Sequence, residues 1–234
     1  MLRVSDLDVF YGKLQVLWGV SLEIQANEIV ALIGANGAGK TTLLKAISGV
    51  VSPVSGGIEF LGRRIEGLKS YAIVDLGISH IPEGRKLFQD MSVRENLEMG
   101  AYPKRVWDQR EAIIDEVFQM LPILKARQSQ IVSTMSGGEQ QMVAMGRGLM
   151  SKPKLCIIDE PSSGLAPLVV DEIFQMIKRL RDDGIAVFLI EQDVQQTLEI
   201  ADRAYVLENG RITLDGESQH LLEDDRIREA YLGL

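Results

Sequence analysis

The pattern of hydrophobic and polar positions changes character along this chain of 234 residues. Residues 2–33 contain three short extended segments, LRVSDLDVF, SLEI and EIVALIG. The last is a continuous apolar run, which is typical of a buried parallel strand, and it leads into a glycine-rich loop. TLLKAISG then predicts a helix that ends at Gly49, and GGIEFLG and GISHIP predict further strands.

Helical periodicity replaces the strands between residues 90 and 150. SVRENLEMG begins at Ser92, a favourable N-cap. QREAIIDEVFQML has apolar residues at helical spacing, namely Ile113, Ile114, Val117, Phe118 and Leu121. MSGGEQQMVAMGRGLM predicts a helix from Gln140 onward, with Met142, Met145 and Leu149 on one apolar face. We therefore predict a single domain over 1–234 with an inserted helical subdomain at 90–150.

Alternation of strands and helices resumes after residue 150. LCIID (155–159) and IAVFLI (185–190) predict strands, and PLVVDEIFQMIKRL (167–180) predicts an amphipathic helix between them. Such a unit implies parallel strands with a right-handed crossover. AYVLENGRITLDG predicts a hairpin that turns at Asn209-Gly210, and EDDRIREAYLGL (223–234) predicts a solvated terminal helix. The fold class is α/β with a mostly parallel sheet.

Charge and composition limit the classes of molecule that this chain is expected to bind. The formal net charge of −8 argues against nucleic acid as a partner, because phosphates would repel the chain, and no basic face supports binding to anionic lipid. The apolar runs are far too short to span a membrane, and the first residues lack the apolar core of a signal peptide. Any membrane role is therefore expected to run through a protein partner.

The single cysteine and the two histidines suggest no metal or disulfide chemistry. Cys156 lies within the apolar run LCII and is expected in the core of a strand. One thiol forms no internal disulfide, which fits a reducing cytosol. His80 and His220 are too isolated to form a metal cluster, so both are interpreted as incidental.

A phosphate-binding loop is predicted at GANGAGKTT, which matches G-x-x-x-x-G-K-[ST] and lies between a strand and a helix. Its backbone N–H groups and the helix N-terminus can surround phosphate oxygens. Lys40 would reach the β and γ phosphates, and the Thr41 hydroxyl would bind Mg²⁺. A flexible loop with a chance match is the alternative, and the strand–helix context argues against it. The predicted contact residues are Gly34, Ala35, Asn36, Gly37, Ala38, Gly39, Lys40, Thr41 and Thr42.

An acidic pair ends the strand LCIID and would face the same ligand. Asp159 and Glu160 lie at the carboxyl end of this strand, where ligands bind in α/β sheets. Asp159 would hold Mg²⁺ through water, and Glu160 could polarise an attacking water. Because strand ends often carry a stray acid, the pair gains its meaning from the phosphate loop.

Two adjacent glycines, Gly137 and Gly138, stand in the first turn of a predicted helix, where each costs about 1 kcal/mol relative to alanine. Ser136 and Glu139 fit a capping box, which leaves the glycines unexplained. Glycine at a helix start lets an anion approach the first-turn amides. A second phosphate site is surplus if one chain holds the whole nucleotide, and it is useful if it binds the nucleotide of another subunit.

These motifs together resemble those of ATP-binding-cassette (ABC) ATPases, and the resemblance covers essentially the whole chain. GANGAGKTT resembles the family's phosphate loop, MSGGEQ its signature motif and LCIIDE its second nucleotide motif. The resemblance implies a P-loop NTPase core with an N-terminal antiparallel β subdomain, and ATP and Mg²⁺ as cofactors. It also implies a head-to-tail dimer in which Ser136, Gly137, Gly138 and Glu139 cap the γ-phosphate held by the other subunit.

Tyr11 falls where the family has an aromatic residue that stacks on adenine, although from the residues alone it is equally an ordinary strand residue. Three other positions depart from the general family pattern. Glu83 replaces a glutamine that reaches Mg²⁺, Gln192 replaces a histidine that contacts the γ-phosphate, and Ala166 replaces an aspartate of a loop that communicates across the dimer. By resemblance, Thr41, Glu83 and Asp159 are assigned to the metal, and Lys40, Glu160 and Gln192 to catalysis.

The chain looks most like the shorter of the two ATPase subunits of bacterial branched-chain amino-acid importers. The stretches that carry this resemblance are IPEGRKLFQDMSVRENL, MSGGEQQMVAMGRGLMSKPKL, SSGLAPL and LIEQDVQQTLEIADRAYVLENGRI. The resemblance implies a second ABC ATPase as partner in a heterodimer or homodimer, two membrane permeases and, indirectly, a secreted or periplasmic binding protein. It places the chain at the cytoplasmic face of the inner membrane as a peripheral subunit.

Residues 83–102 would touch the permease, and Phe88 and Tyr102 within them are otherwise interpreted as subdomain core. Importers of urea or other amides carry near relatives and stay open as an alternative. So does a soluble ABC ATPase that acts on DNA or the ribosome. The 119 residues from Lys40 to Asp159 are too few for the coiled-coil arms of DNA-repair members, and ribosome-acting members usually have two cassettes. An ordinary P-loop kinase is disfavoured by SGGEQ.

Overall fold

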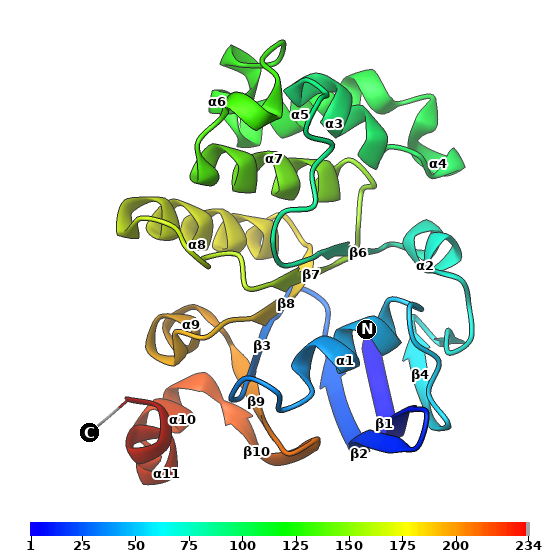
Figure 1. Cartoon of the computed structure of the whole chain (residues 1–234), viewed down its shortest axis with the longest axis vertical. Helices are drawn as coiled ribbons and strands as arrows, with labels where there is room; N and C mark the ends of the chain where they lie inside the picture. The colour runs from blue at the N-terminus through cyan, green and yellow to red at the C-terminus, as the bar shows by residue number, and fades with distance from the viewer. Residues whose placement is uncertain (233–234) are drawn as a thin grey trace.

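A six-stranded sheet runs through the middle of the molecule in the order β10-β9-β3-β8-β7-β6 (Figure 1). Neighbouring strands from β9 to β6 are parallel, and β10 pairs antiparallel with β9 at one edge. The computed structural model describes residues 1–232. The strands are β3 Ile29–Ile33, β6 Ile78–Ile81, β7 Leu155–Asp159, β8 Ala186–Ile190, β9 Arg203–Glu208 and β10 Arg211–Glu217.

The central strands β3, β7 and β8 are buried at every position. This burial explains their continuous apolar sequences, because helices cover both faces of the sheet. Cys156 in β7 is fully buried, as predicted. The hairpin between β9 and β10 is also confirmed, with Asn209 and Gly210 in the left-handed region at φ 49° and 77°.

A second, antiparallel sheet contains the strands near the N-terminus in the order β2-β1-β4-β5. The predicted antiparallel β subdomain is therefore present. Trp18 of β2 donates its backbone N–H to the carbonyl of Gly210 at 2.8 Å, so this sheet meets the β9–β10 hairpin of the larger one. Its strands are β1 Leu2–Tyr11, β2 Leu14–Ile24, β4 Ser55–Phe60 and β5 Arg63–Arg64.

Helices fill the segment between β6 and β7 and form the green upper part of Figure 1. Ser92 caps the first of them through a reciprocal capping box with Glu95. The division of 90–150 into a subdomain stays a prediction. The elements are α3 Val93–Gly100, α4 Lys104–Trp107, α5 Arg110–Met120, α6 Pro122–Ala126, the 3₁₀ turn η1 Val132–Thr134 and α7 Gly137–Leu149.

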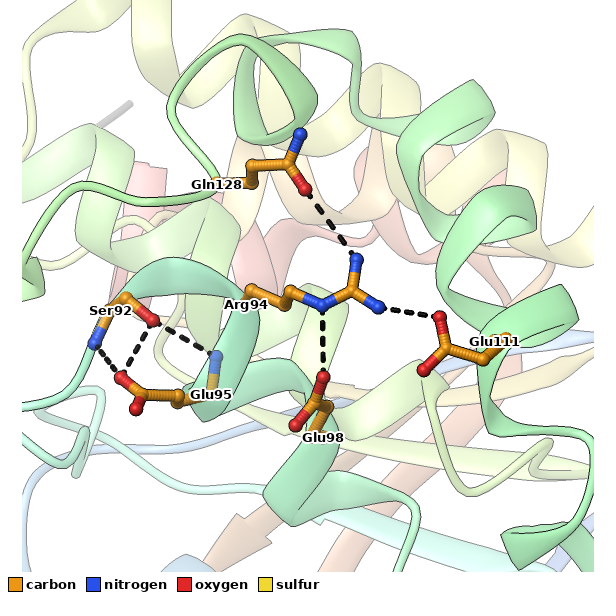
Figure 2. A network of polar contacts seen from close by, with 6 residues as sticks. All are labelled: Ser92, Arg94, Glu95, Glu98, Glu111 and Gln128. Atoms are coloured by element: carbon orange, nitrogen blue, oxygen red, sulfur yellow. Dashed lines mark hydrogen bonds and ion pairs between the residues drawn. The ribbon is translucent and has the colours of Figure 1, made fainter.

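Arg94 joins three parts of this helical region, as Figure 2 shows. Its guanidinium donates to Glu98 one turn later in α3 at 3.0 Å, to Glu111 of α5, and to Gln128 in the connection after α6 at 3.5 Å. The arginine fork thus fixes α3 against α5 and against the segment that leads to α7.

The remaining helices flank the two sheets: α1 Lys40–Ile47, α2 Ser70–Leu76, α8 Pro167–Asp182, α9 Val194–Ile200, α10 Ser218–Glu223 and α11 Asp225–Ile227. Among residues 1–232, no helix has both the length and the apolar character needed to cross a membrane. The amphipathic helix predicted at 167–180 corresponds to α8.

The solvated helix predicted over 223–234 is confirmed for 225–232, where most of the described side chains are exposed, but its predicted start is wrong. Asp224 has extended backbone, and its side chain accepts from the N–H of Arg226 at 2.9 Å, so it ends α10 and starts α11. A π-helical turn, η2 Arg228–Leu232, follows, and Ile227 is buried rather than solvated. Residues 233–234 of the predicted helix lie outside the described residues.

Candidate active site

The phosphate loop leaves the carboxyl end of β3 and enters α1 at Lys40. Gly37 and Gly39 have left-handed backbone, at φ 85° and 112°, which explains why glycine stands there. The Lys40 side chain is buried, and its ammonium donates to the carbonyls of Gly34 at 2.7 Å and Ala35 at 3.3 Å. The lysine therefore curls back over the loop whose amides would hold an anion.

The β9–β10 hairpin packs against this loop. A Cβ atom on Gly34 would lie 2.3 Å from the carbonyl oxygen of Leu207, and one on Gly39 would lie 2.8 Å from Leu17. The N–H of Gly210 donates to the carbonyl of Ala38 at 2.9 Å. Packing against Leu207 thus requires glycine at position 34, and the left-handed φ of 112° together with the nearby Leu17 of β2 requires it at position 39.

A hollow of about 340 Å³ opens above the loop. It brings together predicted residues from four separate segments and adds Val16 of β2, which the sequence did not indicate. The lining residues are Val16, Asn36, Gly37, Gly39, Lys40, Thr41, Thr42, Glu83, Glu160 and Gln192.

Asp159 lies buried at the end of β7 next to this hollow, with 6% of its surface exposed. Burial, together with the negative charges of Glu160 and Glu83, raises the pKa of its carboxyl to about 6, and the positive charge of Lys40 opposes this rise. The site therefore gathers more negative charge than Lys40 alone balances, and a bound cation would stabilise it.

The oxygen ligands at this position fit Mg²⁺. Thr41 offers a hydroxyl, and Glu83 and Asp159 offer carboxylates, which are the hard donors that Mg²⁺ prefers. Within residues 1–232, no three His, Cys, Asp or Glu side chains gather closely enough to hold a metal by themselves. Mg²⁺ usually completes its shell with water and substrate phosphates, so two carboxylates and a hydroxyl are sufficient.

Glu160 and Gln192 meet across the ends of β7 and β8. The Gln192 side-chain amide donates to the Glu160 carboxylate at 2.6 Å. Glu160 has left-handed backbone at φ 46°, and its N–H donates to the carbonyl of Ile190 at 2.9 Å. A left-handed non-glycine residue is costly and is often found where a side chain must be aimed for function.

The predicted signature residues lie at the start of α7 and do not line the hollow above the phosphate loop. Ser136 accepts from the N–H of Glu139 at 3.4 Å, and the Glu139 carboxylate accepts from the N–H of Ser136 at 2.9 Å, so the capping box is present. Arg127 pairs with Glu139 at 2.9 Å and compensates its charge. Tyr11 also lies outside the hollow, 44% exposed at the end of β1.

Residues 17–163 match the family described as ABC transporter. The chain belongs to this family. It is 48% identical over 233 residues, covering all of both chains, to the high-affinity branched-chain amino acid transport ATP-binding protein BraG of Pseudomonas aeruginosa. It is 37% identical to the probable branched-chain amino acid transport ATP-binding protein LivF of Archaeoglobus fulgidus, over 100% of this chain and 99% of that protein.

The fold agrees with solved ABC cassettes. The crystal structure of a nucleotide-free ATP-binding cassette from an ABC transporter superposes with a TM-score of 0.90 at 26% identity, covering 100% of this chain and 99% of the other. Membership of the ABC family makes this chain an ATP-binding, ATP-hydrolysing subunit.

The glycines of the ABC signature have a second explanation that the sequence did not give. A Cβ on Gly138 would lie 2.7 Å from Val169 of α8, so α8 packs directly on the start of α7. A Cβ on Gly137 would lie 3.0 Å from the end of the flexible Arg85 side chain. Anion access therefore accounts for Gly137 better than for Gly138.

Glu191 is a further residue beside the site that the sequence did not indicate. It directly follows β8, is 2% exposed, and accepts hydrogen bonds from Ser162 and from the backbone of Gln192. Its signal in the sequence was weak, because a carboxylate after an apolar strand is common at the surface.

Proposed function

We propose that this chain is the ATPase subunit of an importer that takes up branched-chain or related hydrophobic amino acids. The observation that carries the proposal is the full-length similarity to the Pseudomonas aeruginosa transport protein. Urea and amide importers are the alternative transport systems, and a soluble ABC ATPase is the alternative outside transport.

The residues around the phosphate loop have separate tasks in this proposal. Lys40 and the loop amides bind the triphosphate, and Tyr11 stacks on adenine. Thr41, Glu83 and Asp159 hold Mg²⁺, which neutralises phosphate charge when bound. The Glu160 carboxylate accepts the proton of the attacking water, while the Gln192 side-chain amide holds that carboxylate in place.

A second ABC ATPase subunit completes the site, either a different chain or another copy of this one. Its signature helix would supply the residues that correspond to Ser136, Gly137, Gly138 and Glu139. The position of these residues outside the hollow supports a contact across subunits, because they do not reach a nucleotide held in the same chain.

The permease is assigned to the face formed by residues 83–102. Phe88 and Tyr102 are 43% and 50% exposed, which rules out the subdomain-core interpretation for both. Together with Met99 and Arg147 they line a hollow of about 370 Å³ between the helical region and β6. Exposed aromatic residues around a hollow are typical of a protein interface. The similarity to branched-chain amino acid transport proteins supports the rest of this proposal, namely two permeases, a binding protein outside the membrane and a peripheral location on the cytoplasmic face.

Uptake measurements test the proposal in the source organism. Deletion of the gene for this chain is expected to abolish high-affinity uptake of radiolabelled leucine, isoleucine and valine. The unaltered chain should restore it and Lys40→Ala should not, while Lys125→Ala, at an exposed position of α6, serves as the matched control. Loss of urea or acetamide uptake instead would favour the alternative importers. Unchanged uptake with the chain absent from membrane fractions would favour the soluble ATPase.

A further inference from the structure

The buried carboxylate of Glu191 connects the loop between β7 and α8 to the end of β8. Glu191 is 2% exposed and lies between the last residue of β8 and Gln192. Its Oε1 accepts from the N–H of Ser162 at 2.8 Å, and its Oε2 accepts from the Ser162 hydroxyl at 2.8 Å. Oε2 also accepts from the N–H of Gln192 at 3.2 Å. All three donors are uncharged groups.

These contacts and the Gln192–Glu160 hydrogen bond form a closed network that includes the proposed base, Glu160. Glu160 and Ser162 belong to one loop, Glu191 and Gln192 belong to the next, and the Gln192 amide returns to Glu160 at 2.6 Å. The backbone of Glu160 also bonds to Ile190 at the end of β8. The orientation of the Gln192–Glu160 pair is therefore tied to the position of the loop 161–166.

A carboxylate that is buried without a cation is costly, and such a group persists where hydrogen bonds satisfy it. Burial raises the pKa of Glu191, and the hydrogen bonds from Ser162 and Gln192 oppose that rise. An amide in its place would bring an NH₂ group against N–H donors, so only a carboxylate accepts all three bonds. The geometry thus requires this residue type at position 191.

We propose that Glu191 is a positioning residue for ATP hydrolysis. Its carboxylate accepts hydrogen bonds from both Ser162 and the Gln192 backbone. Gln192 therefore orients Glu160 only while the loop 161–166 keeps its hydrogen bonds to Glu191. This inference rests on the proposed roles of Glu160 and Gln192. By resemblance, the loop 161–166 contacts the second ATPase subunit. Formation of that contact would then affect the orientation of Glu160 through Glu191.

The test measures steady-state ATP hydrolysis by the full chain, purified with the subunits that accompany it. Any partner ATPase carries alanine at its phosphate-loop lysine, so that turnover reports the site of this chain. Glu191→Gln is expected to lower kcat about 10- to 100-fold, as misplacement of a catalytic group does. The KM for ATP should stay unchanged, because Glu191 does not line the nucleotide hollow. Ser162→Ala removes one of the three bonds and should lower kcat less.

A double-variant cycle separates positioning from stability. Because Glu191 acts through Gln192, Glu191→Gln should lower kcat little further when added to Gln192→Ala, although it should lower Tm in both backgrounds. Glu172→Gln, at an exposed position of α8, is the matched control. Equal kcat losses in both backgrounds, or an unchanged kcat in Glu191→Gln, would overturn the inference.

Different results would contradict the proposed function and the inference about Glu191. If Lys40→Ala or Glu160→Gln hydrolyses ATP at the parent rate, the assigned site is wrong, and the role of Glu191 is overturned with it. If both are inactive while Glu191→Gln equals the parent, only the inference about Glu191 fails.

Discussion

The side-chain amide of Gln192 donates a 2.6 Å hydrogen bond to the carboxylate of Glu160, joining the ends of the neighbouring strands β8 and β7. An amide nitrogen carries two N–H bonds, so one can hold Glu160 while the other stays free for a phosphate oxygen. A neutral histidine has one N–H donor and would have to choose between these two acceptors. Glutamine thus suits a site in which the base itself must be held.

Replacement of Gln192 by alanine should slow hydrolysis and spare ATP affinity. Gln192→Ala removes a hydrogen bond to a charged group, which corresponds to a loss of about 10- to 100-fold in kcat. Gln195→Ala, at an exposed position of α9, is the control. Phosphate release and ATP binding are measured in the purified complex. Equal rates for the parent and Gln192→Ala would leave Gln192 without a catalytic role.

The Glu160→Gln variant should lose about 10²–10⁴-fold in hydrolysis rate, the usual contribution of a general base. Its amide oxygen still accepts the bond from Gln192, so the fold around the site should persist. ATP should then accumulate on a closed dimer, visible by size-exclusion chromatography with ATP present. Parent-like turnover, with the partner's own site inactivated, would exclude Glu160 as the base.

The cross-subunit role of the signature is best tested at Gly137. Gly138 is unsuitable, because any side chain there meets Val169. Gly137→Asp faces the movable, charged end of Arg85 and should fold. Its carboxylate would cancel the positive charge of Arg85 and add negative charge at the helix start, so a partner's γ-phosphate would bind less well there. ATP-driven dimerisation should be lost while the affinity of the monomer for ATP is kept. Gly137→Ala controls for bulk, and a monomer affinity as weak as that of Lys40→Ala would contradict the prediction.

His80 should make the protein less stable below neutral pH. Its Nε2 is buried without a hydrogen-bond partner among residues 1–232, and burial lowers the pKa of the ring to about 4. The unfolded chain, with a pKa of about 6.5, binds the proton first, so stability falls as the pH drops from about 6.5 to about 4. Above about 6.5 this contribution is constant.

Between pH 7.5 and pH 5 the His80 share of the loss should be about 2 kcal/mol in the free energy of unfolding. Urea denaturation at both pH values measures it. His80→Leu should show a correspondingly smaller loss over this range than the parent, whereas His220→Leu, at an exposed position, should behave as the parent does. An identical loss in His80→Leu would mean that His80 titrates normally.

Local signals in the sequence were sufficient for much of this structure. The apolar runs of β3, β7 and β8 and the capping boxes at Ser92 and Ser136 follow from neighbouring residues alone. Contacts between distant segments were not predictable, such as Gly210 against the phosphate loop and Glu191 against Ser162. The start of the terminal helix was misplaced because Asp224 ends α10 and caps α11. Phe88 and Tyr102 stayed open because hydrophobicity does not distinguish a core from an interface.

The strand that leads into the phosphate loop, β3, is synthesised long before the strands that pair with it. β3 emerges from the ribosome with residues 29–33, yet its two neighbours in the sheet, β8 and β9, are synthesised only at residues 186–190 and 203–208. Leu207, which packs against the loop, is part of β9, and Gly210 follows directly after that strand. A nascent chain that stops before β9 therefore contains every residue of the loop without the support that shapes it. Until β8 is synthesised β3 is an unpaired apolar strand, and until β9 follows it has a partner on one side only. In that interval the unpaired edge of β3 exposes the nascent chain to misfolding.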